Sequence, residues 1–208
     1  MAATIRGILL AAGYSTRFGS NKLLQALPAG APEAGMPIGL AAAKHLLEAL
    51  PESIAVVRPR AQKLGKILRD AGCNTVVCKN ASEGMGTSLA AGVRATSDAQ
   101  GWIVALADMP FIRPETIRLV TKALQEGAAI AAPSFHGERG HPVGFARRFY
   151  EELSSLHGDD GARQFLKQHR RAEIVRRRVV GNAIHALADA HRGSQMEHRV
   201  DVFQCRAY

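Results

Sequence analysis

Residues 5–22 read IRGILLAAGYSTRFGSNK, and this stretch holds the first clue to the fold. Its opening run, 5–10, is rich in aliphatic residues, as in a buried β-strand. The glycines, hydroxyls and cations that follow the run are typical of a loop. A buried strand that ends in a glycine-rich loop indicates the beginning of an α/β domain.

Similar aliphatic runs recur along the chain, and segments with helical spacing separate them. Parallel strands need crossovers of a dozen or more residues, which these segments supply. We therefore expect an α/β fold of three layers, a Rossmann-like, mostly parallel sheet with helices on both faces. The further strands are expected at 54–57, 75–78, 102–106 and 129–132, and the helices around 40–50, 64–71, 89–93 and 117–124.

The length and composition fit a single globular domain spanning residues 1–208. Hydrophobic residues make up 47% of the chain, which is enough for a core without disulfides or structural metals. No apolar run approaches the roughly 18 residues that cross a bilayer, so we expect a cytoplasmic protein without membrane contact. The three cysteines lack metal-ligand spacing and are expected to be buried free thiols.

The formal net charge of +9 is concentrated near the end of the chain. From Arg163 onward there are ten Lys or Arg against four Asp or Glu, so residues 1–162 carry only +3. We interpret the tail, from about residue 173 to 208, as an atypical basic surface segment. Neither a helix-turn-helix nor interleaved aromatic residues accompany the charge, which argues against nucleic acid as a partner.

The loop after the first strand carries residues suited to anions. Sheets of this type bind ligands beyond the carboxyl ends of their strands. Gly13 and Gly19 would let backbone amides approach phosphate oxygens, and Arg17 and Lys22 supply two cations. The loop thus predicts a phosphate site, although it matches neither the P-loop nor the GxGxxG pattern. The alternative is an ordinary strand-to-helix turn with solvated cations.

Asp108 directly follows the apolar run 102–107. Pro110 keeps the backbone before it extended, so we expect a rigidly held carboxylate at the sheet edge. An aspartate in this position suits Mg²⁺, which takes its other ligands from water and substrate phosphates. The alternative role for Asp108 is a cap or turn before the helix that Pro114 opens.

Two later segments are further candidates for ligand contact. Residues 83–88, EGMGTS, place two glycines and two hydroxyls before a helix, where backbone amides are able to read a base edge or a ribose. The alternative there is a simple helix cap by Thr87 or Ser88. Residues 137–145, GERGHPVGF, predict a tight hairpin from which Arg139 and His141 project.

Together these segments resemble the nucleotidyltransferases of molybdenum cofactor maturation. The resemblance spreads over residues 5–170, and the first motif has LAAG rather than LAGG after the strand. Five ordered motifs carry it: Leu10-Ala11-Ala12-Gly13 with Arg17, Phe18, Gly19 and Lys22-Leu23-Leu24; Asn80 with Gly84, Met85 and Ser88; Ala107-Asp108-Met109-Pro110; Arg139-Gly140-His141-Pro142; and Gly158-Asp159 with Gly161-Ala162-Arg163.

The resemblance implies a nucleotide-diphospho-sugar transferase-like sheet and an Mg²⁺-dependent transfer of NMP from an NTP to the phosphate of molybdopterin, with release of pyrophosphate. Ala12, where guanylyl-transferring relatives have glycine, is similar to the cytidylyltransferase branch, so CTP is the implied donor. The implied nucleotide-binding residues are Leu10, Ala11, Ala12, Gly13, Arg17, Lys22, Asn80, Gly84 and Ser88; the implied catalytic residues are Arg17, Lys22 and Asp108, with the metal on Asp108; and Arg139, His141 and Pro142 would face the pterin.

One feature of these relatives is missing. They carry a second acidic motif near the C-terminus, Asp-Ile-Asp-Thr-Pro, whose aspartate completes the metal site, whereas residues 176–208 contain no such motif. Asn182, Asp189 and Asp201 are the candidate substitutes. The difference leaves a second function open, a catalytically weak or inactive nucleotide-binding module that delivers molybdenum cofactor to a molybdoenzyme.

Overall fold

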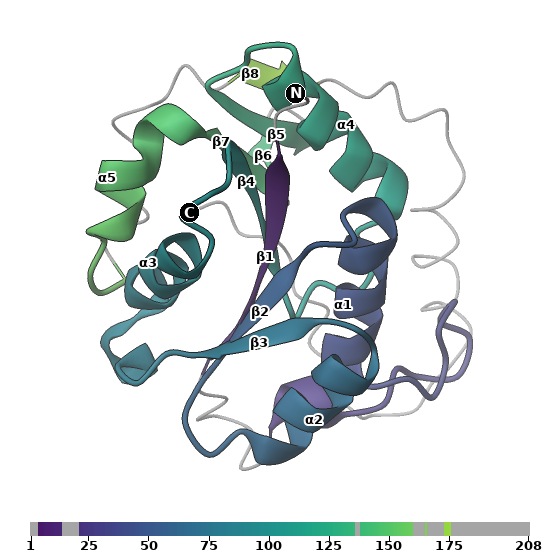
Figure 1. Ribbon diagram of the computed structural model, residues 1–208. Helices are drawn as coiled ribbons and strands as arrows, with labels where there is room; N and C mark the ends of the chain where they lie inside the picture. Colours follow the sequence, from purple (N-terminus) through teal and green to yellow (C-terminus); the bar gives the residue numbers. More distant parts are fainter. Residues whose placement is uncertain (1–3, 14–20, 136–137, 160–164, 166–172, 176–208) are drawn as a thin grey trace.

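The computed structural model describes residues 4–13, 21–135, 138–159, 165 and 173–175. One eight-stranded sheet runs through the molecule in the order β3-β2-β1-β4-β7-β5-β6, with β8 also paired to β5 (Figure 1). The strands are β1 (Ile5–Ala11), β2 (Ile54–Val57), β3 (Asn74–Val77), β4 (Gly101–Leu106), β5 (Ile130–Phe135), β6 (Glu138–Arg139), β7 (Val143–Ala146) and β8 (Glu173–Val175).

The centre of the sheet is parallel. Leu10 of β1 lies opposite Val56 of β2 on one side and Leu106 of β4 on the other, so three strands end at the same edge. β7 is antiparallel to both β4 and β5, and it separates these two strands. The predicted Rossmann-like, mostly parallel sheet is confirmed, and the insertion of β7 is an addition that the sequence pattern did not predict.

Helices cover both faces of the sheet, which confirms the predicted three layers. α1 (Ile38–Ala49), α2 (Gln62–Asp70) and α4 (Pro114–Gln125) lie on one side, and α3 (Met85–Ala95) and α5 (Tyr150–Ser154) lie on the other (Figure 1). The short 3₁₀ helices are η1 (Lys22–Leu24), η2 (Ala81–Glu83) and η3 (Arg147–Phe149).

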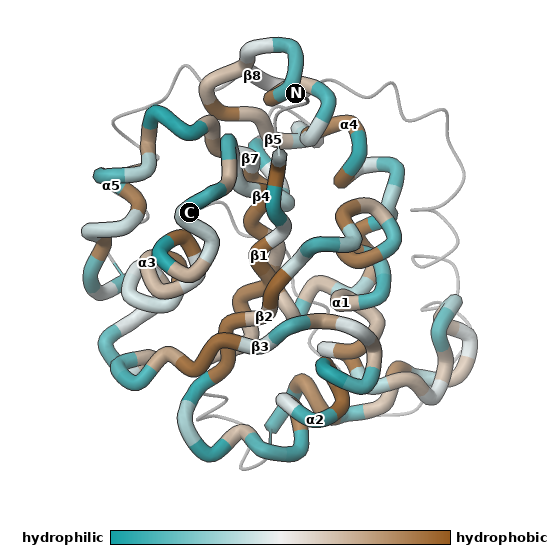
Figure 2. The backbone as a smooth tube through the Cα atoms, in the orientation of Figure 1, coloured by the Kyte–Doolittle hydropathy of each residue, from teal (hydrophilic) through white to brown (hydrophobic). Residues whose placement is uncertain are grey.

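The sheet separates two apolar cores. Successive strand side chains point to opposite faces, so Leu9 of β1 packs in the core under α1 and α4, whereas Ile8 packs in the core under α3 and α5. Strands buried on both faces read as continuous apolar runs, and Figure 2 shows this as hydrophobic colour along β1, β2 and β4. β1, β2 and β4 were recognisable in the sequence for this reason, whereas no residue of β3 is buried.

The segment 137–145 differs from the tight hairpin predicted for it. β6 pairs with the end of β5, with Ser134 opposite Arg139, and β7 pairs with the start of β5, with Ala131 opposite Gly144. Between these two paired positions, β5 has two residues, whereas the chain that runs from β6 to β7 has four, residues 140–143. The extra residues form a bulge between β6 and β7, and His141 lies in this bulge, outside the strand pairing.

Three sequence predictions concern other parts of the chain. Cys73 and Cys78 are buried free thiols as predicted, whereas Cys205 lies outside the described residues. Glu173–Val175 form β8, but the rest of the basic tail lies outside the described residues, so the single-domain assignment stays a prediction. In the described part of the chain, no helix combines the length and the apolar character that a bilayer crossing requires.

Candidate active site

Asp108 leaves the sheet at the exit of β4, beside the end of β1. The Ala107 amide donates to the Leu10 carbonyl at 3.1 Å, which prolongs the β1–β4 ladder by one residue. Ala107 and Pro110 are buried, whereas the side chain of Asp108 is 43% exposed. Because its backbone neighbours are anchored, the carboxylate is held at the carboxyl edge of the sheet.

Of the two alternative roles of Asp108, the helix cap is wrong, whereas the turn is confirmed: Asp108 lies in a turn in which the Met109 amide donates to the Leu106 carbonyl at 3.1 Å. The N-cap of α4 is Arg113, five residues further along, and no side chain caps that helix. Pro114 occupies the first turn of α4, as the sequence indicated. The carboxylate of Asp108 is therefore not consumed by the helix that follows it.

Lys22 meets Asp108 from the far end of the first loop. Its Nζ lies 4.0 Å from Asp108 Oδ2, and its side chain is 17% exposed. Lys22 opens η1, which is anchored by the buried Leu23 and by an Asn21 side chain that accepts from the Leu23 amide at 3.2 Å. A partly exposed ion pair at this distance adds little stability, so its significance is the convergence of opposite charges at one point of the edge.

The backbone before that loop is also fixed. Ala12 is buried, whereas Gly13 is exposed, and the Gly13 carbonyl accepts from the Arg58 guanidinium at 3.1 Å. Arg58 immediately follows β2 and was not among the predicted residues. Arg17 belongs to residues 14–20, which lie outside the described residues. We call Ala12, Gly13, Lys22 and Asp108 the β1–β4 wall of the site.

The second wall is the start of α3, residues 83–88, which we call the α3 wall. The Met85 amide donates to Asp159 Oδ1 at 2.6 Å, and the Gly86 amide donates to the Gly158 carbonyl at 2.8 Å. Two backbone amides that the sequence offered to a base or ribose are thus bound within the protein. Asp159 belongs to a quoted motif, but nothing in the sequence indicated that it caps α3.

The remaining polar groups of the α3 wall are arranged differently. Gly84 is the N-cap of α3, so Thr87 and Ser88 lie inside the helix, and their predicted alternative as caps is wrong. Ser88 is buried, and its hydroxyl donates to the Gly84 carbonyl at 3.5 Å. The side chain of Asn80 is exposed and has no hydrogen-bond partner among the described residues.

Arg139 and His141 form the third wall, which we call the β6–β7 wall. Burial lowers the pKa of Arg139. Burial also lowers the pKa of His141, the nearby Arg139 guanidinium lowers it further, and the Asp108 carboxylate acts in the opposite direction. His141 is therefore neutral at pH 7 and close enough to Asp108 to sense its charge. Pro142, next in the chain, is buried.

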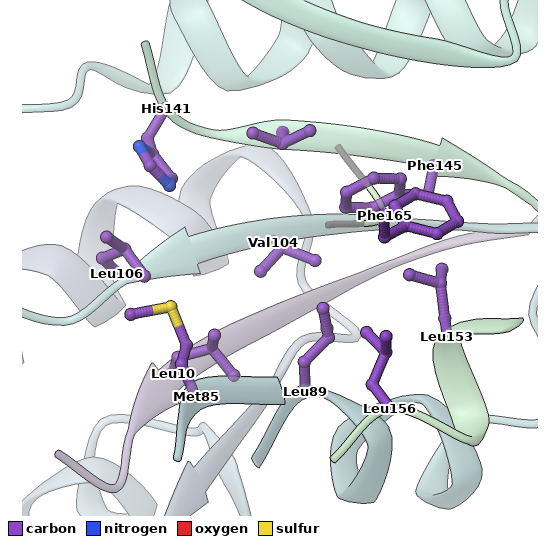
Figure 3. Close-up of a pocket in the computed structure, with 11 residues that line it drawn as sticks. Leu10, Met85, Leu89, Val104, Leu106, His141, Phe145, Leu153, Leu156 and Phe165 are labelled. Carbon is purple, nitrogen blue, oxygen red and sulfur yellow. The ribbon is translucent and has the colours of Figure 1, made fainter. Parts of the chain in front are cut away.

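An apolar cavity of about 50 Å³ lies between the sheet and α3, with Met85 of the α3 wall and His141 of the β6–β7 wall in its lining. Figure 3 shows Leu10, Met85, Leu106 and His141 at one end of this cavity, so it joins β1, α3, β4 and the β6–β7 wall. Ligand pockets usually measure about 300–1,000 Å³. This cavity is therefore much smaller than an ordinary ligand pocket.

A larger groove of about 430 Å³ lies on another side of α3. Asn80, Glu83, Thr87 and His157 are among its lining residues. The groove is mostly polar, in contrast to the cavity, whose named lining is apolar except for His141. The first turn of α3 is thus a partition between an apolar and a polar hollow.

The residues at the β1–β4 wall fit a magnesium ion that is shared with a substrate. Mg²⁺ keeps several waters and is commonly bound through one or two carboxylates plus substrate phosphates, and Asp108 is a half-exposed carboxylate of this kind. Among the described residues, no group of three or more His, Cys, Asp or Glu side chains forms a metal site of its own. The substitutes Asn182, Asp189 and Asp201 lie outside the described residues.

Comparison with known proteins gives the family of the chain. Residues 7–173 match the family model described as a MobA-like NTP transferase domain. The purine catabolism protein PucB of Bacillus subtilis (strain 168) is 30% identical over 179 residues, which cover 77% of this chain and 80% of PucB.

Solved structures with a similar fold were also found. The crystal structure of Rv0371c from Mycobacterium tuberculosis H37Rv is 26% identical, covers 92% of this chain and 97% of its own, and has a TM-score of 0.68; a complex of Rv0371c with manganese is also similar. A CMP:2-keto-3-deoxy-manno-octonic acid synthetase complexed with CTP shares 13% identity over 91% of this chain and 97% of its own, with a TM-score of 0.62. At that identity, the last similarity shows the fold alone.

Proposed function

Because the chain belongs to the family of MobA-like NTP transferase domains, a nucleotidyltransferase family related to molybdenum cofactor biosynthesis, we propose that it transfers CMP from CTP to the phosphate of molybdopterin. The predicted family resemblance is confirmed, and nucleotidyl transfer is the activity of this family. The donor base, the acceptor and the metal are the parts of the proposal that go further. Pyrophosphate is the second product.

The observation that carries the proposal is the meeting of Lys22 and Asp108 at 4.0 Å, at the exits of β1 and β4. In nucleotidyl transfer the acceptor phosphate attacks the α-phosphorus in line, so no protein nucleophile is needed. The enzyme must instead hold two anions together and neutralise the charge that grows on the leaving pyrophosphate. A fixed cation beside a metal-binding carboxylate meets this requirement.

We assign Asp108 as the ligand of the magnesium ion. When bound, the ion would supply positive charge that offsets the negative charge of the nucleotide phosphates. Lys22 and Arg17 supply cationic side chains for the same triphosphate, and the exposed Gly13 supplies a backbone that phosphate oxygens are able to approach closely. These assignments rest on the β1–β4 wall and on the family resemblance.

The nucleoside and the acceptor take the other two walls. Asn80, with its exposed side chain, is our candidate for reading the base, with Gly84 and Ser88 beside it. Arg139 supplies a partly buried guanidinium for the anionic acceptor, with the neutral His141 as a hydrogen-bonding group. Pro142 completes this wall.

The preference for CTP rests on Ala12. Its side chain is buried in the core under α3 and α5. Relatives that transfer GMP have glycine here, so we attribute the preference to the way the buried methyl fixes the backbone of Ala12 and Gly13, and not to direct contact with the nucleotide. Ala12→Gly should therefore narrow the difference in affinity between CTP and GTP.

A second candidate is a nucleotide-binding module that delivers cofactor to a molybdoenzyme with little turnover. The observation that favours it is the lone carboxylate of Asp108 at the β1–β4 wall among the described residues, together with a C-terminal sequence that lacks the second acidic motif. This candidate predicts nucleotide binding without pyrophosphate release.

One experiment tests both candidates. Melting temperatures are measured with each of the four nucleoside triphosphates and Mg²⁺, because a ligand that binds only the folded state raises the melting temperature. Pyrophosphate release is then measured with molybdopterin. A shift that is largest with CTP, followed by pyrophosphate release, supports the transferase; binding without release supports the module; and a larger shift with GTP refutes the CTP preference.

A further inference from the structure

A segment that follows α5 holds the first turn of α3. We call residues 157–159 the α3 clamp. Besides accepting from the Met85 and Gly86 amides, the clamp donates: the Gly158 amide gives a hydrogen bond to the Thr87 hydroxyl at 3.1 Å. Three hydrogen bonds within three consecutive helix residues fix both the position and the rotation of this turn.

The clamp approaches so closely that two residues of the turn must be glycine. A Cβ on Gly84 would lie 2.4 Å from the Asp159 amide nitrogen, and a Cβ on Gly86 would lie 2.6 Å from the Gly158 carbonyl oxygen. Gly84 also has a φ of +136°, which side chains rarely tolerate. These glycines are thus explained by contact within the protein, without a ligand.

The clamped turn borders both hollows of the site. The Met85 side chain, 48% exposed, lines the apolar cavity with Leu10 and His141. Thr87 lines the polar groove together with Asn80 and His157, and His157 belongs to the clamp itself. A movement of the clamp therefore changes the distance between the α3 wall and the groups that face it.

We propose that Asp159 is a positioning residue for the nucleotide. The inference rests on the proposed function, because it takes residues 80–88 as the part of the site that holds the base and ribose. The Asp159 carboxylate satisfies an amide at the positive end of α3, a charge-assisted contact that keeps the wall in one orientation. Asp159 touches no reacting group, and it acts through Met85 and Gly84.

In the proposed function the reacting phosphates lie at the β1–β4 wall, whereas the clamp contacts the α3 wall. Contacts to the base and ribose stabilise the bound substrate and the transition state alike, so their loss raises KM and leaves kcat nearly unchanged. A loss of overall stability would instead lower the fraction of folded enzyme and reduce kcat without a specific effect on KM. The split between KM and kcat separates the two roles.

The experiment compares the parent protein with Asp159→Ala, Asp159→Asn and Arg118→Ala. Asn keeps an oxygen that is able to accept from the Met85 amide. Arg118 is the control, because its guanidinium donates to the Glu48 carbonyl at 3.2 Å and so ties α4 to α1 on the other face of the sheet, and it lines neither hollow of the site. Affinity is measured by calorimetry with whichever of the four nucleoside triphosphates the parent binds most tightly, and KM and kcat are measured by pyrophosphate release.

Asp159→Ala should weaken nucleotide binding and raise KM about tenfold, with kcat changed by less than about threefold. Asp159→Asn should recover most of the affinity, and Arg118→Ala should leave it unchanged even where its melting temperature falls equally. Unchanged affinity in Asp159→Ala, or an equal loss in Arg118→Ala, overturns the inference while the proposed reaction stands. Binding by the parent without transfer refutes the reaction, and the affinities then still decide the inference. A parent that binds no nucleoside triphosphate overturns both.

Discussion

The β1–β4 wall and the α3 wall use their polar groups in opposite ways. On the β1–β4 wall, Asp108 is 43% exposed and approaches Lys22 only to 4.0 Å, while the backbone beneath both side chains is firmly anchored. On the α3 wall, backbone amides make hydrogen bonds of 2.6 and 2.8 Å to Asp159 and Gly158. On the β1–β4 wall the Asp108 carboxylate stays partly exposed, whereas on the α3 wall two backbone amides are already hydrogen-bonded within the protein.

This difference separates chemistry from architecture within one site. A loosely paired carboxylate contributes little to folding, so its removal should affect turnover and leave stability unchanged. A clamped helix terminus contributes to folding, so its disruption should affect stability first and nucleotide affinity second. The following substitutions test whether the two walls separate in this way.

The largest effect is expected for Asp108→Ala. Loss of the charge that holds the metal should lower pyrophosphate release about 10³-fold. The free energy of unfolding should change by less than about 0.5 kcal/mol, because the side chain is half-exposed and weakly paired. Turnover assays and urea unfolding measure the two quantities on the same preparation.

Asp70→Ala is the control for the loss of a negative charge. Asp70 is exposed on α2, where it pairs with Lys66 at 2.6 Å. This variant should keep full turnover. Equal losses of turnover in the two variants would mean that net charge, and not the position of Asp108, determines the rate.

Gly84→Ala should have the largest effect on the α3 wall. The new methyl would lie 2.4 Å from backbone atoms of the clamp, at a φ of +136°. We expect a loss of about 3 kcal/mol in the free energy of unfolding, measured by denaturant titration.

The control for Gly84→Ala is Gly30→Ala. Gly30 also has a positive φ, +93°, but nothing lies within 4 Å of its Cβ position, so it isolates the backbone cost, about 1 kcal/mol. If Gly84→Ala lost no more unfolding free energy than Gly30→Ala, the α3 clamp would be able to move and accommodate the new methyl at no cost in stability.

Arg58→Ala tests how the β1–β4 wall is anchored. Without the hydrogen bond to the Gly13 carbonyl, the first loop should lose part of its preorganisation, and KM for the nucleotide should rise about fivefold. Lys63→Ala, an exposed cation in the first turn of α2, removes the same charge without touching the loop. A rise in KM for both variants would point to long-range electrostatics instead.

The arrangement of the sheet could be predicted because burial leaves a direct mark on the sequence. The run Ile54–Val57 is buried at every position, and its predicted bounds agree with the structure. β7 was not predicted as a separate strand, because its four residues give no periodic signal and nothing local specifies that it lies between β4 and β5. Strand order depends on contacts between distant segments.

In the candidate site, too, residues marked by their local sequence were predicted, whereas residues placed by contacts between distant segments were not. Asp108 and Lys22 were recognisable because each sits directly beside an apolar strand or a glycine-rich loop. The contact of Arg58 with Gly13 and the role of Asp159 as the cap of α3 were not predicted. The two residues of each contact lie 45 and 74 positions apart in the sequence. Register places Arg58 beside the first loop, since Ala11 pairs with Val57, and register is a property of the folded sheet.

The smallest effect concerns His141 and the dependence of stability on pH. Burial and the Arg139 guanidinium lower the pKa of His141 in the folded protein, so the unfolded chain, in which histidine has its ordinary pKa of about 6.5, binds this proton more readily. The stabilisation is therefore complete above pH 6.5 and is lost as the pH falls through the lowered folded pKa. His141→Gln should flatten the decline in unfolding free energy as the pH falls from about 7.5 to 5.

Two further substitutions test the direction in which neighbouring charges change the pH dependence of stability. Arg139→Gln removes a cause that lowers the pKa of His141, so it should weaken the decline, whereas Asp108→Asn removes the opposing carboxylate and should steepen it. An anionic acceptor bound at the β6–β7 wall should favour the protonated imidazole, and its binding should then take up a proton, measurable by calorimetry in two buffers of different ionisation enthalpy. If the decline were the same in Arg139→Gln, Asp108→Asn and the parent, His141 would be isolated from both charges, and the β6–β7 wall would not share an electrostatic environment with the β1–β4 wall.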